Sequence, residues 1–237
     1  MTEQVTIAPR FRGPPDSANG GYACGVLARF IDAADAEVSL RAPPPLGRPL
    51  AVTRDGGRVE MHDGETLVAE GGSLGELELE PPAPVDPEQA DAASRGSSLH
   101  EHHPFPTCFV CGPEREPGDG LRLIPGRVQG REIVAGTWTP DPSLKVDGGR
   151  VPPEVEWATL DCPSGNAAMM LLPDLGVSVL ARLATRIVAR VEPGVRHVGV
   201  GWVLGRNGRK VHSGSALFTA DGELVGIGRA LWIELRR

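Results

Sequence analysis

The architecture of this chain is decided by two stretches, Pro-Asp-Ser-Ala-Asn-Gly-Gly-Tyr-Ala-Cys-Gly-Val-Leu-Ala at residues 15–28 and Pro-Pro-Glu-Val-Glu-Trp-Ala-Thr-Leu-Asp at residues 152–161. Each stretch opens an apolar run of helical character, and a series of strand-like segments follows each one. Both series contain an Asp-Gly-Glu turn, at residues 63–65 and 221–223. An internal repeat fixes the architecture before any motif is interpreted. The sequence therefore predicts two halves with the same order of elements.

The first half predicts one long helix followed by a meander of short strands. Apolar residues recur at helical spacing over residues 20 to about 35, and Asn19 is placed to cap the start of this helix. Alternating segments follow, separated by the turn signals Pro43-Pro44-Pro45, Asp55-Gly56 and Asp63-Gly64. Short alternating segments joined by Asp-Gly turns are typical of antiparallel strands. We expect these strands at residues 37–41, 48–53, 57–61 and 66–70.

The second half predicts the same order. Two strand-like segments at residues 121–123 and 131–138 precede a helix over about 153–172. Strands are expected at 177–191, 196–204, 210–219 and 224–235, with hairpin turns at Asn207-Gly208 and Asp221-Gly222. The Pro- and Ala-rich segment 81–104 reads as a linker with a short helix at 87–95. We therefore divide the chain into domains at residues 1–80 and 105–237, joined by this linker.

Bulk properties narrow the class of partner. The chain has 237 residues, a formal charge of −7 and a pI near 5.4. This acidic balance argues against a nucleic acid or an anionic membrane, because both bind through clustered Lys and Arg, and it favours a small molecule. The N-terminal residues lack the pattern of a signal peptide, no window approaches 18 apolar residues, and four cysteines are too few for a disulfide scaffold. We expect a cytoplasmic protein.

The element order resembles the hotdog fold in its fused double form, as found among acyl-CoA thioesterase-like proteins. The resemblance rests on the helix start Asn19-Gly20-Gly21, on the helix at residues 157–161, and on Cys-Phe-Val-Cys-Gly-Pro at 108–113 followed by Gly-Leu-Arg-Leu at 120–123. It implies an α+β fold of two tandem hotdog domains, each a long helix wrapped by an antiparallel sheet. The two would share one continuous sheet of roughly ten to twelve strands, like paired single hotdogs.

The resemblance also places a site between the halves. Helices of these thioesterases often open with a His-Gly-Gly-like sequence and carry an acid nine positions later. Asn19-Gly20-Gly21 matches the opening, but the ninth position after Asn19 is Ala28; in the second half the acid is present as Asp161, but the glycine pair is missing. In the family the acid and the helix start at one site come from opposite halves. One complete site and one vestigial site are therefore expected.

The roles follow from this placement. Asp161 would act as general base or as nucleophile, and the backbone N–H groups of Gly21 and Tyr22 would form an oxyanion hole at the positive end of the helix. We further predict that substrate is bound by Asn19, Gly20, Trp157, Arg206 and Arg209. Trp157 would line an acyl pocket. Arg206, Arg209 and Lys210 would meet the phosphates of coenzyme A.

Structural alternatives stay open for several of these residues. Asp161 could instead cap a helix that begins at Cys162 with Pro163 in its first turn, and the glycine pair could form a plain tight turn. If the helix continues through Asp161, Pro163 should kink it.

The cysteines allow two interpretations. Cys108 and Cys111 follow His100, His102 and His103 closely, a set that contains enough ligands for zinc. We adopt the alternative of reduced, packed thiols and predict no metal. Cys162 could be a nucleophile with His197 or His212 as its base, but nothing in the sequence places either histidine beside it, and we adopt a buried thiol here too.

These inferences predict a thioesterase-like protein that hydrolyses an acyl-CoA or another acyl thioester between its two domains. No cofactor is expected apart from the coenzyme A portion of the substrate. A non-catalytic protein that binds acyl thioesters or lipids is the alternative from another class. An enoyl-thioester hydratase would need a His-Asp pair on the helix, and neither predicted helix contains a histidine. A homodimer of double hotdogs remains open.

Overall fold

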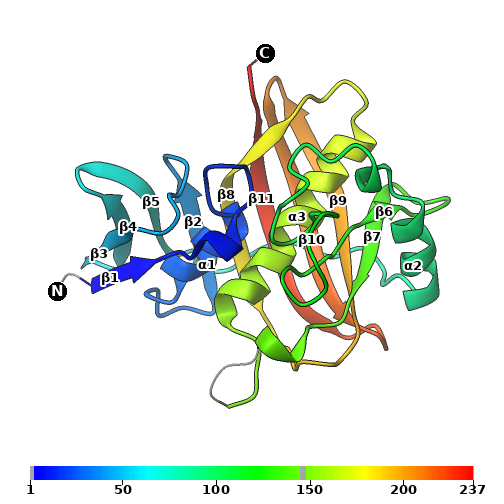
Figure 1. Ribbon diagram of the computed structural model, residues 1–237, viewed down its shortest axis with the longest axis horizontal. Helices are drawn as coiled ribbons and strands as arrows, with labels where there is room; N and C mark the ends of the chain where they lie inside the picture. Colours follow the sequence, from blue (N-terminus) through cyan, green and yellow to red (C-terminus); the bar gives the residue numbers. More distant parts are fainter. Residues whose placement is uncertain (1–2, 145–147, 237) are drawn as a thin grey trace.

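One antiparallel sheet of 11 strands organises the computed structural model, which describes residues 3–144 and 148–236. The strands lie in the order β1-β3-β4-β5-β2-β8-β11-β10-β9-β7-β6 (Figure 1). Their bounds are β1 Glu3–Thr6, β2 Asp35–Leu40, β3 Pro49–Asp55, β4 Arg58–Asp63, β5 Thr66–Ser73, β6 Gly126–Arg127, β7 Ile133–Trp138, β8 Ser178–Ile187, β9 His197–Asn207, β10 Lys210–Thr219 and β11 Leu224–Glu234. The predicted tandem hotdog architecture with one continuous sheet is confirmed.

The two halves join where β2 pairs with β8. Five consecutive residue pairs align these strands antiparallel, from Asp35 with Arg186 to Ser39 with Arg182. At the start of this register the Asp35 carboxylate accepts hydrogen bonds from the Arg186 guanidinium at 2.7 and 2.5 Å. The backbone ladder and a charged pair therefore hold the halves together in one register.

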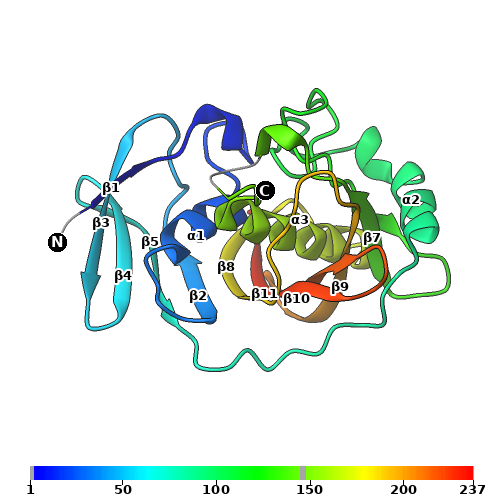
Figure 2. The ribbon, with the colours of Figure 1, turned by 90° about the horizontal axis from the view of Figure 1, so that it is seen from below.

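Two helices lie side by side on one face of the sheet (Figures 1 and 2). They are α1, Gly20–Ala28, from the first half and α3, Pro153–Leu171, from the second, and they pack against each other. Small residues allow this close approach: a Cβ on Gly25 would lie 2.6 Å from Glu154 Cα and 2.8 Å from Trp157 Cβ. The two helix starts are thereby brought against the flank of the opposite helix.

The first helix is shorter than the sequence predicts. Asn19 caps it as expected, accepting from the Tyr22 N–H, but the helix ends at Ala28 rather than near residue 35. The N–H groups of Phe30 and Ile31 bond to carbonyls three residues earlier, which tightens the chain into a turn. Both side chains pack against the core from this turn. Their apolar character therefore reflects burial in the core, although the chain is no longer helical at these positions.

The second helix runs through Pro163 without interruption. The alternative in which Asp161 caps a helix beginning at Cys162 is therefore wrong. Pro163 lies against β9, where a Cβ on Gly201 would be only 2.0 Å from the Pro163 carbonyl oxygen. The tight packing of helix on strand holds this turn of α3 in place although proline offers no N–H.

The remaining elements mostly follow the prediction. Helix α2 spans Pro87–Arg95 as expected, with Asp86 as its cap, whereas residues 121–123 form no strand and the short β1 and β6 are absent from the prediction. Short 3-10 turns lie at Pro9–Phe11, Ser98–His100 and Pro142–Leu144.

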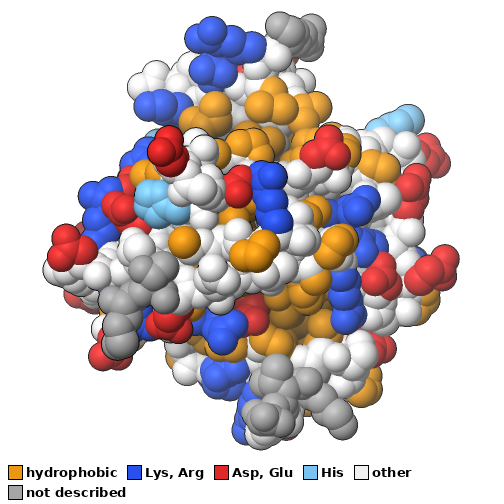
Figure 3. Space-filling model, turned by 60° about the vertical axis from the view of Figure 1, so that its left-hand side comes forward, with side chains coloured by type: hydrophobic (Ala, Val, Ile, Leu, Met, Phe, Trp, Pro, Cys, Tyr) orange, Lys and Arg blue, Asp and Glu red, His pale blue; other side chains and the backbone are white. Residues whose placement is uncertain are grey.

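The segment between β5 and α2 crosses the sheet face opposite the helices (Figure 2). It buries Leu77 against Ala184 and Ile227, and farther along Val85 and Ala90 join a cluster with residues of β7 and β9. Part of the predicted linker therefore belongs to the core. On the face shown in Figure 3, acidic and basic side chains are interspersed, and hydrophobic side chains gather in patches between them.

No helix in the described part of the chain is long and apolar enough to cross a membrane.

Candidate active site between the two halves

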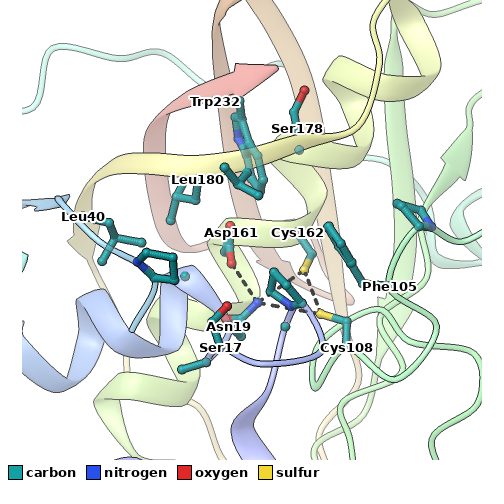
Figure 4. Close-up of a pocket in the computed structure, with 18 of the residues that line it drawn as sticks. Ser17, Asn19, Leu40, Phe105, Cys108, Asp161, Cys162, Ser178, Leu180 and Trp232 are labelled. Atoms are coloured by element: carbon teal, nitrogen blue, oxygen red, sulfur yellow. Dashed lines mark hydrogen bonds between the residues drawn. The ribbon is translucent and has the colours of Figure 1, made fainter. Parts of the chain in front are cut away.

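A cavity of about 520 Å³ opens at the start of α1, and both halves line it. The first half supplies residues 13–20 and 40–44. The second half supplies residues of the 103–111 segment, of α3, of β8 and of the end of β11. Leu40, Phe105, Leu180 and Trp232 make much of the wall apolar, and Asn19 and Asp161 lie together within it (Figure 4).

Asp161 is held against the start of the opposite helix. Its Oδ2 accepts a hydrogen bond from the Gly21 N–H at 2.8 Å and another from the Asn19 Nδ2 at 2.8 Å. A Cβ on Gly21 would lie 2.4 Å from Asp161 Cβ, so only glycine allows this approach. The predicted meeting of the glycine-rich helix start and the acid from the other half is what the structure contains.

The Asp161 carboxyl group is almost completely buried, with 2% of the residue exposed. Burial raises its pKa to about 7; the hydrogen bonds from Gly21 and Asn19 oppose this rise, and a negative charge on Cys108 would add to it. Its second oxygen, Oδ1, is buried and has no hydrogen-bond partner within the described residues. One carboxylate oxygen is thus held by two donors, and the other is enclosed without a partner among the described residues.

Asn19 connects the helix cap to the carboxylate. Its Oδ1 accepts from the Tyr22 N–H at 2.9 Å, while its Nδ2 donates to Asp161. The Asn19 backbone N–H donates to the Phe11 carbonyl at 2.8 Å and fixes the residue from the other side. One amide side chain therefore starts α1 and orients the acid of α3.

The predicted oxyanion donors are already engaged in this conformation. The Gly21 N–H bonds to Asp161 and the Tyr22 N–H bonds to Asn19, while the Tyr22 ring stacks on Phe11 with centroids 3.9 Å apart. Gly20, which we predict to bind substrate, lines the cavity, and over residues 3–144 and 148–236 its N–H has no hydrogen-bond partner. The first N–H of the helix, rather than the second and third, is free to meet a carbonyl oxygen.

Three predicted binding residues lie away from the cavity lining. Trp157 is buried in the core against Gly25 of α1. Arg206 donates to Glu234 Oε2 at 2.9 Å, and Arg209 donates to the Glu234 carbonyl at 2.9 Å, both at the β9–β10 hairpin. The assignment of Trp157 to the acyl pocket is wrong, because α1 covers that side of α3.

A different arginine lines the cavity. Arg41 directly follows β2, is half exposed and pairs with Glu70. Sequence reasoning missed this residue, since its position depends on where the end of β2 lies relative to the cavity.

The side chains of three of the four cysteines meet beside Asn19 and Asp161. The sulfur atoms of Cys108, Cys111 and Cys162 all lie within 4.8 Å of one another, and all three residues are buried and line the cavity. The Cys108 and Cys162 sulfurs are 3.7 Å apart, and Asn19 Nδ2 is 3.8 and 3.7 Å from them. These three are the residues of the site that could hold a metal ion.

The histidines considered as bases for Cys162 are engaged elsewhere. His197 Nδ1 lies 2.7 Å from the Val195 carbonyl and its ring packs near Trp138, while His212 is exposed on β10. The neighbouring thiols of Cys108 and Cys111, together with burial, raise the pKa of Cys162 well above its usual value. A nucleophilic thiolate with a histidine base is not formed here.

The position of α1 that corresponds to Asp161 of α3 carries no acid. Position 28 is alanine, and the nearby Glu154 faces Arg29, with Oε1 and Nη1 3.6 Å apart. The vestigial site at the start of α3 stays a prediction.

No protein-family profile matches the chain, and no curated protein sequence matches it. Solved structures do. A Thermobifida fusca protein described as a candidate thioesterase II has 16% identity and a TM-score of 0.63, covering 99% of this chain and 92% of its own. Acyl-CoA thioesterase II TesB2 of Mycobacterium marinum has 13% identity and a TM-score of 0.59, covering 100% and 93%. An Alicyclobacillus acidocaldarius protein of unknown function with a hot dog fold has 10% identity and a TM-score of 0.60, covering 100% and 94%.

These likenesses extend over the whole chain and show its fold. Together with the eleven-stranded sheet and the paired helices, they define a double-hotdog protein. Its candidate site lies where the start of α1 meets the middle of α3.

Proposed function

We propose that this protein hydrolyses an acyl thioester of coenzyme A in the cavity between its halves. The observation that carries the proposal is the contact of a buried Asp161 with the start of α1 inside a mainly apolar cavity. A carboxylate beside a helix N-terminus offers a base and hydrogen-bond donors within one small volume. The structures with thioesterase names support the same reaction class at the level of fold.

The proposed reaction begins with a water molecule at Asp161 Oδ1. The carboxylate takes a proton from this water as its oxygen forms a bond to the thioester carbonyl carbon, and the negative charge moves to the carbonyl oxygen. The Gly20 N–H, at the start of α1, is the nearby donor for that oxygen. Collapse of the intermediate breaks the C–S bond, and the leaving thiolate takes the proton back from Asp161.

Attack by the Asp161 carboxylate itself, through a transient anhydride, remains an alternative first step. Both routes need the ionised form of Asp161, and in both the Gly21 N–H holds one carboxylate oxygen in place.

The walls of the cavity favour an acyl group of moderate size. Leu40, Phe105, Leu180 and Trp232 surround the space beside Asp161, and the volume of about 520 Å³ matches a small-molecule site. Arg41 lines the same cavity and carries the charge that a phosphate of coenzyme A would meet.

A binding protein without catalysis is the second candidate. It is favoured by one observation: the N–H groups of Gly21 and Tyr22 already have partners, so fewer donors face a bound carbonyl. A hydratase has less support, because neither α1 nor α3 contains a histidine.

Hydrolysis of a panel of acyl-CoA esters separates these candidates. We expect the wild type to release free coenzyme A and Asp161→Asn to lower kcat by about 10²- to 10⁴-fold, since the base is lost in a side chain of nearly equal size. Asp174→Asn, which changes an exposed carboxylate of the same half, serves as the matched control and should keep full activity.

Two outcomes would contradict the proposal. If Asp161→Asn turned over substrate at the wild-type rate, the site would be wrong. If the wild type bound acyl-CoA in calorimetry but hydrolysed no member of the panel, the binding function would replace the enzymatic one.

A further inference from the structure

Three cysteine sulfurs meet beside the cavity from two separate parts of the chain. Cys108 and Cys111 lie in the loop before residues 120–123, and Cys162 follows Asp161 on α3. The Cys108 and Cys162 sulfurs are 3.7 Å apart, and the Cys111 sulfur is within 4.8 Å of both. Four ligands around zinc at about 2.3 Å place neighbouring sulfurs roughly 3.8 Å apart in a tetrahedron. The spacing therefore suits a single metal ion bound by all three.

The loop that carries two of them is a tight cysteine turn. The Gly112 N–H donates to the Cys108 carbonyl at 2.9 Å, and a Cβ on Gly112 would lie 2.5 Å from that same oxygen. Glycine is thus required directly after Cys111. The turn brings the Cys111 sulfur to within 4.8 Å of the Cys108 sulfur. In this way the loop presents two sulfurs on one side.

Side-chain N–H groups lie close to the three cysteine sulfurs. His103 Nε2 lies 3.2 Å from the Cys111 sulfur, and the Phe105 N–H donates to His103 Nδ1 at 2.9 Å. Because Nδ1 accepts, the proton of the neutral ring sits on Nε2 and is donated to sulfur. His103 is therefore a hydrogen-bond donor to a ligand rather than a ligand itself.

Two amides complete this environment. The Asn19 Nδ2 lies within 3.8 Å of both Cys108 and Cys162. Asn166, one turn after Cys162 on α3, is 2% exposed and lines the cavity, and its Nδ2 has no partner that meets hydrogen-bond geometry in the described residues. Donors aimed at sulfur are what metal-bound thiolates require and what three neutral packed thiols do not.

We propose that Cys108, Cys111 and Cys162 bind one zinc ion as thiolates, at a site that borders the candidate active site. Two charges of the ion and three of the sulfurs leave a net charge of −1, which the surrounding N–H donors stabilise. All three cysteines line the cavity, so the fourth position is reached from the cavity by water or by a thiol. The prediction of simple packed thiols is replaced by this proposal.

The proposal stands apart from hydrolysis and is tested without measuring it. The full chain is produced in zinc-supplemented medium, purified under reducing conditions without a chelator, and its metal content is determined by mass spectrometry. We expect about one zinc per chain. The metal-free wild type, prepared with a chelator, is then titrated with Co²⁺. Thiolate-to-cobalt charge-transfer bands and the strong visible bands of tetrahedral cobalt are expected.

Variants distinguish ligation from folding. Cys111→Ser and Cys162→Ser should lose the zinc and the charge-transfer bands, while Cys24→Ser is the matched control because Cys24 is also buried but bonds to the Val38 carbonyl away from the cluster. His103→Ala should keep the bands and weaken binding by about 10- to 100-fold, as expected for a group that only donates to a ligand.

The titration of the wild type keeps the test decisive even if a cysteine variant fails to fold. Metal-free wild-type protein that stays folded by circular dichroism but gives no charge-transfer bands with Co²⁺ would overturn the proposal. Equal zinc content in Cys24→Ser, Cys111→Ser and the wild type would overturn it as well.

Discussion

The main chain of Gly21 and the side chain of Asp161, 140 residues apart in the sequence, are in direct contact. The Gly21 N–H donates to Asp161 Oδ2 at 2.8 Å, and a Cβ on Gly21 would lie 2.4 Å from Asp161 Cβ and 3.1 Å from Ala158 Cα. The neighbours that would have to move belong to α3, which is packed on the sheet and cannot yield easily. The two helices can therefore approach this closely only while residue 21 is glycine.

Gly21→Ala should separate α1 from α3. We expect a loss of about 1–3 kcal/mol in the free energy of unfolding, as for other overpacked sites, together with loss of hydrolysis because Asp161 is displaced. Urea denaturation and acyl-CoA hydrolysis measure the two effects. The matched control is Gly205→Ala on β9, where a Cβ meets nothing within 4 Å, and it should change neither quantity appreciably. Equal effects at both positions would show that the contact does not constrain the helices.

Asn19 has two functions that substitutions can separate. Asn19→Ala removes the cap of α1 and the donor to Asp161, so it should cost about 1 kcal/mol of stability and lower kcat. Serine also caps helices but its hydroxyl is too short to serve the Tyr22 N–H and Asp161 together. Asn19→Ser should therefore keep stability within about 0.5 kcal/mol of the wild type and still lower kcat about 10-fold or more. Thermal unfolding and steady-state kinetics on both variants test this; full activity of Asn19→Ser would remove Asn19 from the site.

The local sequence pattern predicted the helices that form the site, but the packing of those helices determines which side chains reach the cavity. The cap at Asn19 follows from short-range sequence, as does the helix that carries Asp161. The same pattern predicted too long a helix for α1. Phe30 and Ile31 fit the helical spacing of apolar residues, but they are buried from a turn that follows the helix. Trp157 and Asp161 share a helix face, but Trp157 is covered by α1 at Gly25, which only the packing of the two helices reveals.

Contacts between distant segments were harder to foresee. The C-x-x-C motif indicated two sulfurs, but the third comes from Cys162, which belongs to another element and was interpreted alone. The arginines at the β9–β10 hairpin looked suited to phosphate because they cluster in sequence, yet Glu234 from β11 engages both. Glu234 becomes the partner of these arginines only through the order of the strands in the sheet, which local sequence patterns do not predict.

The Asp35–Arg186 pair between β2 and β8 should make stability depend on pH. The hydrogen bonds from Arg186 and, after them, the Leu77 N–H hold the pKa of Asp35 below its usual value, against the effect of burial. A group with a lowered folded pKa contributes stability above its unfolded pKa of about 3.9 and loses it as the pH falls through the folded pKa. Asp35→Asn should therefore cost about 1–2 kcal/mol at pH 7, the lower part of the range for charged hydrogen bonds since Arg186 is partly exposed.

Urea unfolding of the wild type and Asp35→Asn across pH 3 to 7 measures this dependence. The difference between them should narrow below about pH 4 as Asp35 is protonated in the wild type. Asp63→Asn is the control, because the Arg48–Asp63 pair lies at the surface and should contribute only about 0–1 kcal/mol. A difference that stays constant down to pH 3 would exclude the ion pair as its cause.

Arg41 should contribute to binding of coenzyme A, and Arg206 should not. Both arginines pair with a glutamate, Arg41 with Glu70 and Arg206 with Glu234, but of the two only Arg41 lines the cavity. Arg41→Ala is expected to raise KM for an acyl-CoA by about 3- to 10-fold with little change in kcat, an effect that shrinks at high salt because Arg41 is half exposed. The same variant should leave KM unchanged for an acyl thioester of N-acetylcysteamine, which lacks the phosphates, and Arg206→Ala should leave both values unchanged. If Arg206→Ala raised KM for the acyl-CoA alone and Arg41→Ala did not, coenzyme A would extend toward the β9–β10 hairpin, as the sequence alone suggested.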